Sequence, residues 1–202
     1  MCIKKLSVVV SVSKGKSSYV PAPTSSVLTD LHERIRTCTL CPLHETRTHA
    51  VPGCCNPHSR ILFVGEAPGR REDEMGLPFV GRAGTLLDEL LFMIGLSREE
   101  VFITSILKCR PPGNRMPRLQ EISSCTPYLM RQIEAIDPRL ICALGSVAKR
   151  FFDIKSKRGT PFQWEERAIV PTYHPAAALY NPALRKALEA DFRLIRGIMD
   201  TL

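Results

Sequence analysis

Residues 61–69 read Ile-Leu-Phe-Val-Gly-Glu-Ala-Pro-Gly, an apolar run that passes directly into a loop framed by two glycines. Comparable apolar runs, partly β-branched, occur at residues 101–107, 140–144 and 168–170, the last continuing to Tyr173. Runs of this length and composition are typical of buried strands. The sequence therefore contains four candidate strands, and the first of them leads straight into a loop that can carry function.

Segments with apolar residues at helical spacing lie between and around these runs. They cover residues 27–35, 86–94, 122–136 and 182–201, and each places its apolar side chains on one face. Strands that alternate with helices form parallel sheets with helices on both faces. We therefore expect an α/β fold, with the functional residues on loops at the carboxyl ends of the strands.

The composition is that of a globular protein with a basic charge. The 202 residues are 44% hydrophobic and 24% charged, which suits one domain with its own core. We assign this domain to residues 27–202 and expect residues 1–26, which contain lysines and serines but no acid, to form a disordered basic extension. The net charge of +8 favours an anionic partner such as nucleic acid or a membrane surface.

No segment is expected to cross a membrane, and the cysteine pattern favours a reducing compartment. The longest apolar run near the N-terminus, residues 6–12, is interrupted by serines and is far shorter than the roughly 20 residues of a spanning helix. The eight cysteines are unevenly spaced in a chain that is long for a disulfide-stapled protein. We therefore expect a cytoplasmic monomer whose thiols bind metal.

Four of the cysteines are candidates for a metal centre. Cys38 and Cys41 form a Cys-x2-Cys pair before the first candidate strand, and Cys109 and Cys125 follow far along the chain. Thiolates from separate segments must converge to hold one centre, which can be a zinc ion or an iron–sulfur cluster. The spacing alone does not distinguish the two.

The four other cysteines, which are Cys2, Cys54, Cys55 and Cys142, have no expected role in that centre. Cys142 falls within a candidate strand, where a cysteine behaves as a small core residue. Cys54 and Cys55 lie in the turn-rich stretch Pro52-Gly53-Cys54-Cys55-Asn56-Pro57. There we expect exposed thiols that can be oxidised.

The loop at residues 65–69 is suited to bind an anion or to stabilise a developing negative charge. It follows a candidate strand directly, so its backbone N–H groups can point at such a ligand. It is neither a Walker loop nor a dinucleotide-binding turn, because no Lys-Ser or Lys-Thr follows Gly69 and the glycine spacing differs. Two carboxylates, Glu72 and Asp73, come next, and Phe79 lies on a glycine-framed turn further on.

Motifs of this kind are spread over most of the chain in a fixed order. They are Cys38-x2-Cys41, Gly65-Glu66-Ala67-Pro68-Gly69 with Glu72-Asp73, Pro78-Phe79-Val80-Gly81, Lys108-Cys109-Arg110-Pro111-Pro112-Gly113-Asn114-Arg115, Gly145, and His174-Pro175. In order and spacing, from about Cys38 to the C-terminus, they resemble the type-4 uracil-DNA glycosylases.

This resemblance implies a fold, an activity and a cofactor. The fold is a three-layer α/β/α arrangement with a central four-stranded parallel sheet. The activity is DNA repair by hydrolysis of the N-glycosidic bond of uracil in single- or double-stranded DNA, which leaves an abasic site. The cofactor is a 4Fe-4S cluster held by Cys38, Cys41, Cys109 and Cys125.

The resemblance also implies a pocket for a uracil base that has been flipped out of DNA. Its substrate-binding residues would be Gly65, Glu66, Ala67, Phe79, Ser105 and His174, with Phe79 stacking on the base. His174 and backbone amides near Glu66 and Ala67 would stabilise the negative charge on the departing oxygen. Ala67 stands where another branch of the superfamily has an aspartate that positions water, so Glu66 or Asp73 is expected to take that role.

Basic residues near the expected pocket and near Cys109 are candidates to hold DNA phosphates. Their positive charges suit the phosphate backbone, and they lie in or beside the motifs above. They are Arg70, Arg71, Arg82, Lys108, Arg110 and Arg115.

Ser105 is a departure from the family pattern, which has an asparagine whose amide reads the uracil edge. A hydroxyl offers less reach and a single donor. Strand alternation leaves open whether Ser105 faces the pocket or the core, because it shares a face with Ile103 and Leu107. The departure keeps open a glycosylase of the same fold that acts on another deaminated base or binds the abasic product. A separate alternative is a non-catalytic iron–sulfur or zinc module that binds nucleic acid, in which the loop and His174 have no catalytic role.

Overall fold

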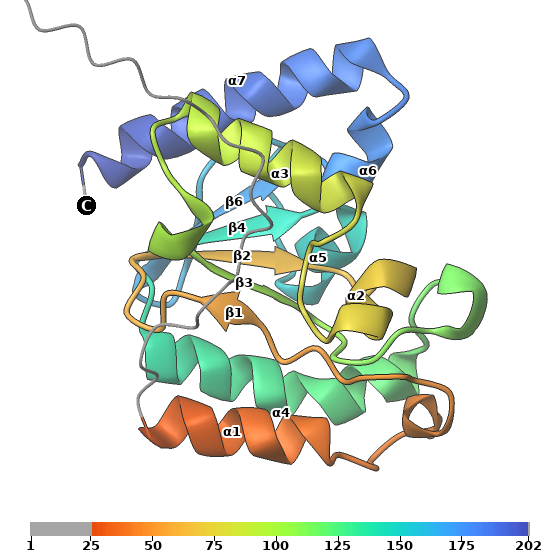
Figure 1. Ribbon diagram of the computed structural model, residues 1–202. Coiled ribbons are helices and arrows are strands. Elements are labelled where there is room, and N and C mark those ends of the chain that lie inside the picture. Colours follow the sequence, from red (N-terminus) through yellow and green to blue (C-terminus); the bar gives the residue numbers. More distant parts are fainter. Residues whose placement is uncertain (1–25, 202) are drawn as a thin grey trace, which may run out of the picture.

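One mixed sheet forms the centre of the computed structural model, which describes residues 26–201 (Figure 1). In spatial order its strands are β1 (Cys54–Cys55), β3 (Phe102–Ser105), β2 (Ile61–Gly65), β4 (Leu140–Leu144), β6 (Arg167–Thr172) and β5 (Phe162–Trp164). The four inner strands run parallel, whereas β1 and β5 pair antiparallel at the edges. The four predicted strands are confirmed as the inner sheet.

The edge strands correct the expected strand count. Within residues 26–201 the sheet has six strands, where the sequence predicts four. β1 contains two residues and β5 contains three. Both are shorter than the roughly four to eight residues over which period-2 alternation identifies a strand, so even the single apolar-polar-apolar repeat of β5 is no signal.

Helices cover both faces of the sheet and produce the expected three layers (Figure 1). α1 (Ser26–Arg36), α4 (Leu119–Ile136) and α5 (Ser146–Phe151) pack on one face. α3 (Arg82–Met93), α6 (Pro175–Ala178) and α7 (Pro182–Met199) pack on the other. The connections contain α2 (Arg70–Met75) and the 3-10 helices η1 (Pro42–Glu45), η2 (Arg98–Glu100) and η3 (Pro112–Asn114).

The inner strands alternate their side chains between the two helical layers. In β2, Leu62 and Val64 are buried in the core cluster that contains α1 and α4. Ile61 and Phe63 face the other layer, where the rings of Phe63 and Phe192 stack with centroids 5.8 Å apart. This alternation explains why the strand is apolar throughout: both of its faces are covered.

α1 shows a small error in the predicted apolar face. Its buried residues include Leu28, Leu31 and Ile35, whereas Val27 is 64% exposed. The helix begins at Ser26, so that residue belongs to the helix; the rest of the extension expected at 1–26 lies outside the described residues. Between residues 26 and 201, no helix is long and apolar enough to cross a membrane.

The carboxyl ends of the inner strands bring three loops together. β2 ends at Gly65 and leads through residues 66–69 to α2. β3 ends at Ser105, which pairs with Gly65 in the parallel register. β6 leads to His174, the N-cap residue of α6. Loops that leave the carboxyl edge of such a sheet are where α/β proteins bind their ligands.

Candidate active site at the carboxyl edge of the sheet

A pocket of about 440 Å³ opens at this edge. Its volume is within the range of about 300–1,000 Å³ that is usual for small-molecule sites. Five of the six expected substrate-binding residues line it: Glu66, Ala67, Phe79, Ser105 and His174. The sixth, Gly65, lies beneath the ring of Phe79, because a Cβ on Gly65 would be 2.8 Å from the Phe79 Cζ atom.

Phe79 and His174 form a stacked pair within the pocket. Their ring centroids are 5.5 Å apart and the ring planes differ by 25°. Phe79 has a φ of +51°, in the left-handed region that side-chain-bearing residues rarely adopt. Its main chain is packed tightly, since a Cβ on Gly84 of α3 would lie 1.8 Å from the Phe79 carbonyl oxygen. Only glycine fits at position 84.

His174 is held as a neutral imidazole with a defined tautomer. Its Nδ1 accepts a hydrogen bond from the Ala176 N–H at 3.1 Å, which assigns the ring proton to Nε2. Burial lowers the pKa of His174 to about 4, against the opposing effect of the Glu72 charge. Gly145 allows the close approach of the two loops, because its φ is +92° and a Cβ there would be 3.0 Å from the His174 Cβ. At neutral pH, Nε2–H is therefore a donor.

Ser105 lies on the pocket wall and not in the closed core. Its Oγ would be 3.2 Å from a Cβ on Gly65, and the residue is almost fully buried. The Ser105 carbonyl accepts a hydrogen bond of 2.6 Å from Lys108 Nζ. Of the two orientations that strand alternation left open, the structure has the one in which the hydroxyl side borders the pocket.

The two carboxylates expected to position water differ in their surroundings. Glu66 lines the pocket, and burial raises the pKa of its carboxyl group. Asp73 is only 4% exposed, and both of its carboxylate oxygens accept from the Thr48 N–H, at 3.0 and 3.2 Å. Asp73 therefore anchors a neighbouring loop, and its expected catalytic role is wrong for that reason.

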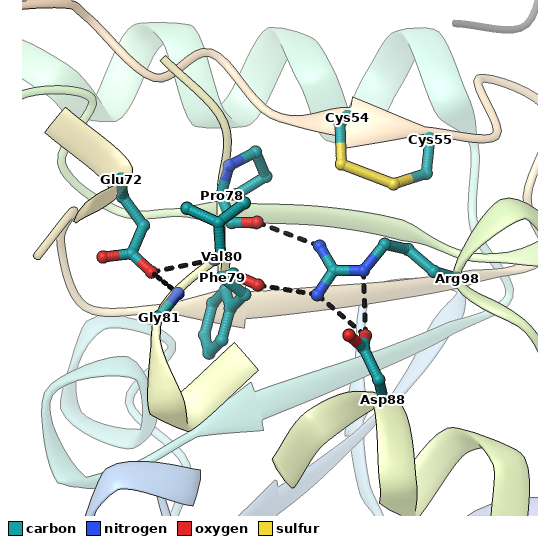
Figure 2. A network of polar contacts seen from close by, with 9 residues as sticks. All are labelled: Cys54, Cys55, Glu72, Pro78, Phe79, Val80, Gly81, Asp88 and Arg98. Atoms are coloured by element: carbon teal, nitrogen blue, oxygen red, sulfur yellow. Dashed lines mark hydrogen bonds and ion pairs between the residues drawn. A yellow bond between two sulfur atoms is a disulfide. The ribbon is translucent and has the colours of Figure 1, made fainter. Parts of the chain in front are cut away.

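Glu72 has a structural role that no sequence pattern indicates. Its Oε1 accepts hydrogen bonds from the N–H groups of Val80 and Gly81, at 2.9 and 2.8 Å, and the side chain borders the pocket (Figure 2). The carboxylate fixes one side of the turn that carries Phe79. A contact between a side chain and a backbone eight residues later leaves no periodic pattern in a sequence.

The four candidate metal ligands surround one small cavity. Cys38 and Cys41 come from the segment after α1, Cys109 from the loop after β3, and Cys125 from α4. Arg47 Nη1 donates to the Cys109 sulfur at 3.1 Å. In the part of the chain described, no three His, Cys, Asp or Glu side chains are close enough to hold a metal ion as they stand.

The donor chemistry of this cavity nevertheless fits a thiolate-bound cluster. Four sulfurs from three segments line it without a carboxylate among them. Burial raises the pKa of Cys125 to about 11 and also raises the pKa of Cys41 and of Cys109. Such thiols are protonated at neutral pH until a metal displaces the protons. The Arg47 contact is of the kind that stabilises a ligating sulfur, and no sequence pattern indicates it.

The comparison with known proteins agrees with the geometry. Residues 52–194 match the Uracil DNA glycosylase superfamily. The type-4 uracil-DNA glycosylase of Sulfurisphaera tokodaii is 47% identical over 188 residues, which are 86% of this chain and 86% of that protein. The chain belongs to the type-4 uracil-DNA glycosylase family. The type-4 enzyme of Archaeoglobus fulgidus is 48% identical over 83% of this chain and 91% of its own length, and a type-5 uracil-DNA glycosylase of Pyrobaculum aerophilum is 35% identical over half of each chain.

Six residues of this glycosylase family member are expected to contact DNA. Five of them lie on or near its surface. Arg70 pairs with Glu74, Arg71 is exposed, and Arg82 lies over the Tyr180 ring at 4.9 Å from its centroid. Arg110 contacts Asn114. Arg115 borders the pocket and binds Glu121 through two hydrogen bonds.

Lys108 is the exception, and its expected contact with DNA phosphates is wrong. It is 1% exposed, and its Nζ donates to Thr104 Oγ1, Ser105 O and Gln132 Oε1 at 2.6–2.7 Å. Burial lowers the pKa of Lys108 to about 7. Lysine is almost always a surface residue, so a buried lysine with three acceptors was not foreseeable from composition.

Of the predictions for Cys54, Cys55 and Cys142, which lie outside the cavity, one is confirmed and one is wrong. Cys142 is fully buried in β4, as predicted. Cys54 and Cys55 are buried in β1 and joined by a disulfide (Figure 2), so their expected exposure is wrong. Pairing of β1 with the edge of β3 draws this stretch into the sheet.

Proposed function

We propose that the protein is a DNA repair glycosylase that removes uracil from DNA by hydrolysing its N-glycosidic bond and leaves an abasic site. The observation that carries this proposal is the single pocket bordered by Phe79, Ser105, His174 and the loop after β2. The similarity to type-4 uracil-DNA glycosylases over most of the chain supports it. The catalytic domain, which begins with α1 at Ser26, acts as a cytoplasmic monomer on single- or double-stranded DNA.

Base binding in this proposal begins with extrusion of the uracil nucleotide from the stack, because the bond is unreachable inside a duplex. The flipped base stacks on the Phe79 ring, which is fixed in the pocket against Gly65. Stacking on an aromatic ring is worth about 1–3 kcal/mol per base. Arg70, Arg71, Arg82, Arg110 and Arg115 hold the flanking phosphates.

Bond cleavage leaves negative charge on the departing uracil oxygen. His174 meets it with Nε2–H, the donor that the Ala176 contact leaves available. The low pKa of His174 keeps the ring neutral, so it donates a hydrogen bond without transferring a full charge. Backbone amides near Glu66 and Ala67 assist, and pre-organised donors of this kind usually supply the largest catalytic contribution.

Water activation falls to Glu66, the remaining acidic candidate that borders the pocket. Its raised pKa makes the carboxylate a better proton acceptor than an exposed glutamate. Ala67, in the same loop, has no group that could take this role. The electrostatic contribution of His174 and the loop amides supplies the rest of the rate.

The cofactor in this proposal is a 4Fe-4S cluster held by Cys38, Cys41, Cys109 and Cys125. When bound, the cluster would link separate segments of the chain and would take no part in the reaction at the base, since its ligands are outside the pocket. The ligands join the segment after α1, the loop after β3 and α4. The loop after β3 continues to Pro111, Asn114 and Arg115, which border the pocket.

Ser105 favours one variant of this function, a glycosylase with relaxed base specificity. A serine hydroxyl at the pocket wall has one donor and no amide with which to read both polar groups of the uracil edge. Other deaminated bases, such as hypoxanthine, are therefore candidate substrates beside uracil.

A single-turnover assay tests the proposal directly. Protein in excess is mixed with an oligonucleotide that contains one uracil, and abasic sites are counted as strand breaks after alkali. A hypoxanthine-containing oligonucleotide and a normal oligonucleotide serve as matched controls. Breaks at uracil alone support the proposal, and breaks at both uracil and hypoxanthine support the variant. Breaks at hypoxanthine alone, or tight binding without any breaks, would contradict both.

A further inference from the structure

The turn that carries Phe79 is held from two opposite sides. On one side, the Glu72 carboxylate accepts the N–H groups of Val80 and Gly81. On the other side, the carbonyl groups of Pro78 and Phe79 both point to the guanidinium of Arg98 (Figure 2). Because Phe79 has a φ of +51°, the turn needs such contacts to persist.

Arg98 makes four polar contacts with this part of the molecule. Its Nη1 donates to Pro78 O at 3.0 Å and its Nη2 to Phe79 O at 2.7 Å. Nε and Nη2 contact Asp88 Oδ1 of α3, each at 2.8 Å. The side chain is only 18% exposed, so water competes weakly for these contacts. The planar guanidinium group can donate hydrogen bonds to two carbonyls and a carboxylate at the same time. A lysine ammonium group cannot do so in the same geometry.

The Phe79 carbonyl is confined between α3 and Arg98. A Cβ on Gly84 would lie 1.8 Å from that oxygen, so the helix backbone blocks movement toward α3. The guanidinium contacts the same oxygen. Arg98 itself does not border the pocket. Arg98 therefore acts on a bound base through the main chain of Pro78 and Phe79, which both border the pocket.

We propose that Arg98 is a positioning residue for uracil excision: it fixes the main chain of Phe79 so that the ring keeps the orientation in which an extruded base can stack. Asp88 orients the guanidinium, and the capping box of Ser97 and Glu100 orients the 3-10 helix from which Arg98 extends. This inference rests on the function proposed above, because it concerns the same pocket.

Replacement of Arg98 should slow the reaction without removing any group that touches substrate. In Arg98→Gln, the carbonyls of Pro78 and Phe79 lose their shared donor and the ring gains freedom to move. Misplacement of a substrate-positioning group by about 1 Å can cost up to about 10²-fold in rate. We expect a loss of roughly 10-fold in the single-turnover rate on uracil-containing DNA, with unchanged binding to undamaged DNA.

A double-mutant cycle with Phe79→Ala separates positioning from a general loss of structure. If Arg98 acts through Phe79, Arg98→Gln should slow the parent about 10-fold but change the rate of Phe79→Ala by less than about 2-fold. An equal loss in both backgrounds would overturn the inference. Arg98→Lys should behave like Arg98→Gln in this cycle, and it carries the test if the glutamine variant does not fold.

Asp88→Asn is the matched control. It removes the charge that orients Arg98 but leaves the guanidinium and both carbonyl contacts in place. Its rate should fall by less than about 3-fold. A loss as large as that of Arg98→Gln would mean that the charge pair, and not the contact with the Phe79 carbonyl, is what matters.

Limited digestion with chymotrypsin gives a readout that does not depend on activity. The protease cuts after phenylalanine, and the fragments produced by cleavage between Phe79 and Val80 are identified by mass. This cut should be at least about 10-fold faster in Arg98→Gln than in the parent, under conditions in which both are folded. Equal rates would refute the role of Arg98. A parent that releases no base would refute the proposed function instead, while the digestion still decides whether Arg98 holds the turn.

Discussion

The pocket and the cysteine cavity both involve the loop that runs from Lys108 to Arg115, yet they are held in place by different means. Around the pocket, two groups that set the geometry are paired within the chain: Glu72 with two N–H groups, and His174 with the N–H of Ala176. Around the cavity, three of the four thiols are buried with raised pKa values. The pocket is thus complete in the polypeptide alone, whereas the cavity is suited to a metal centre that the polypeptide does not supply.

This difference predicts that changes in the pocket affect rate, whereas changes in the cavity affect folding. His174→Ala should give the largest effect on rate. Loss of one well-placed donor to a developing negative charge costs about 10²–10³-fold. Single-turnover cleavage of uracil-containing DNA measures it, and the melting temperature should stay within a few degrees of the parent. Cleavage at the parental rate would remove His174 from the mechanism.

Cys109→Ala should have the opposite profile. Loss of one ligand should abolish the iron bound per chain and the visible absorbance of the cluster, and lower the melting temperature by roughly 10 °C, as expected for several kcal/mol in a domain of this size. The rate per folded molecule should change little. Cys142→Ala, in the core of β4, is the control: it should keep its iron. Stoichiometric zinc in the parent would contradict the iron–sulfur assignment.

Ser105→Asn sharpens the comparison by adding a group to the pocket wall. If the amide reaches the uracil edge, the single-turnover rate on uracil should rise about 5-fold or more, the lower end of the roughly 1–3 kcal/mol of a base-reading contact. The rate on hypoxanthine should not rise with it. Ser105→Ala is the control for loss of the hydroxyl. A fully folded Ser105→Asn protein with an unchanged or lower uracil rate would show that the position does not read the base.

The smallest expected effect is on the pH dependence of stability. The pKa of His174 is about 4 in the folded protein, below its ordinary value of 6.5. As the pH falls, His174 therefore binds a proton in the unfolded chain before it does so in the folded protein. The contribution of His174 to the free energy of unfolding is complete above pH 6.5 and declines toward pH 4. This histidine contributes at most about 1.4 kcal/mol per pH unit in that window. His174→Gln should flatten the decline in urea titrations, and a decline as steep as in the parent would assign it to other groups, such as His32.

The inner sheet could be predicted from the sequence because the pattern that identifies each strand lies within a few consecutive residues. Runs such as Ile61–Gly65 and Leu140–Leu144 are apolar throughout, and that pattern survives in the structure because both faces are covered. Residues at strand ends, such as Ser105, could be assigned to the carboxyl edge on the same basis. Which way the Ser105 side chain points required the register with Gly65.

The groups that hold the pocket could not be predicted in this way. Arg98 and Glu72 bind backbone atoms of a turn, and such contacts depend on where chains cross and not on any repeat of side-chain type. Lys108 and Asp73 were misassigned because charged residues near a site are expected at the surface. Both are buried, and their partners come from distant segments: Gln132 from α4 and Thr48 from the segment before β1.

The edge strands of the sheet also bear on how the molecule behaves at high concentration. A long exposed edge offers unpaired N–H and C=O groups to another chain, and so invites aggregation or strand exchange. The parallel strands β3 and β6 would each present such an edge if they were outermost. Instead β1, with two residues, and β5, with three, cover them with short antiparallel segments. These caps leave a second copy little backbone on which to extend the sheet.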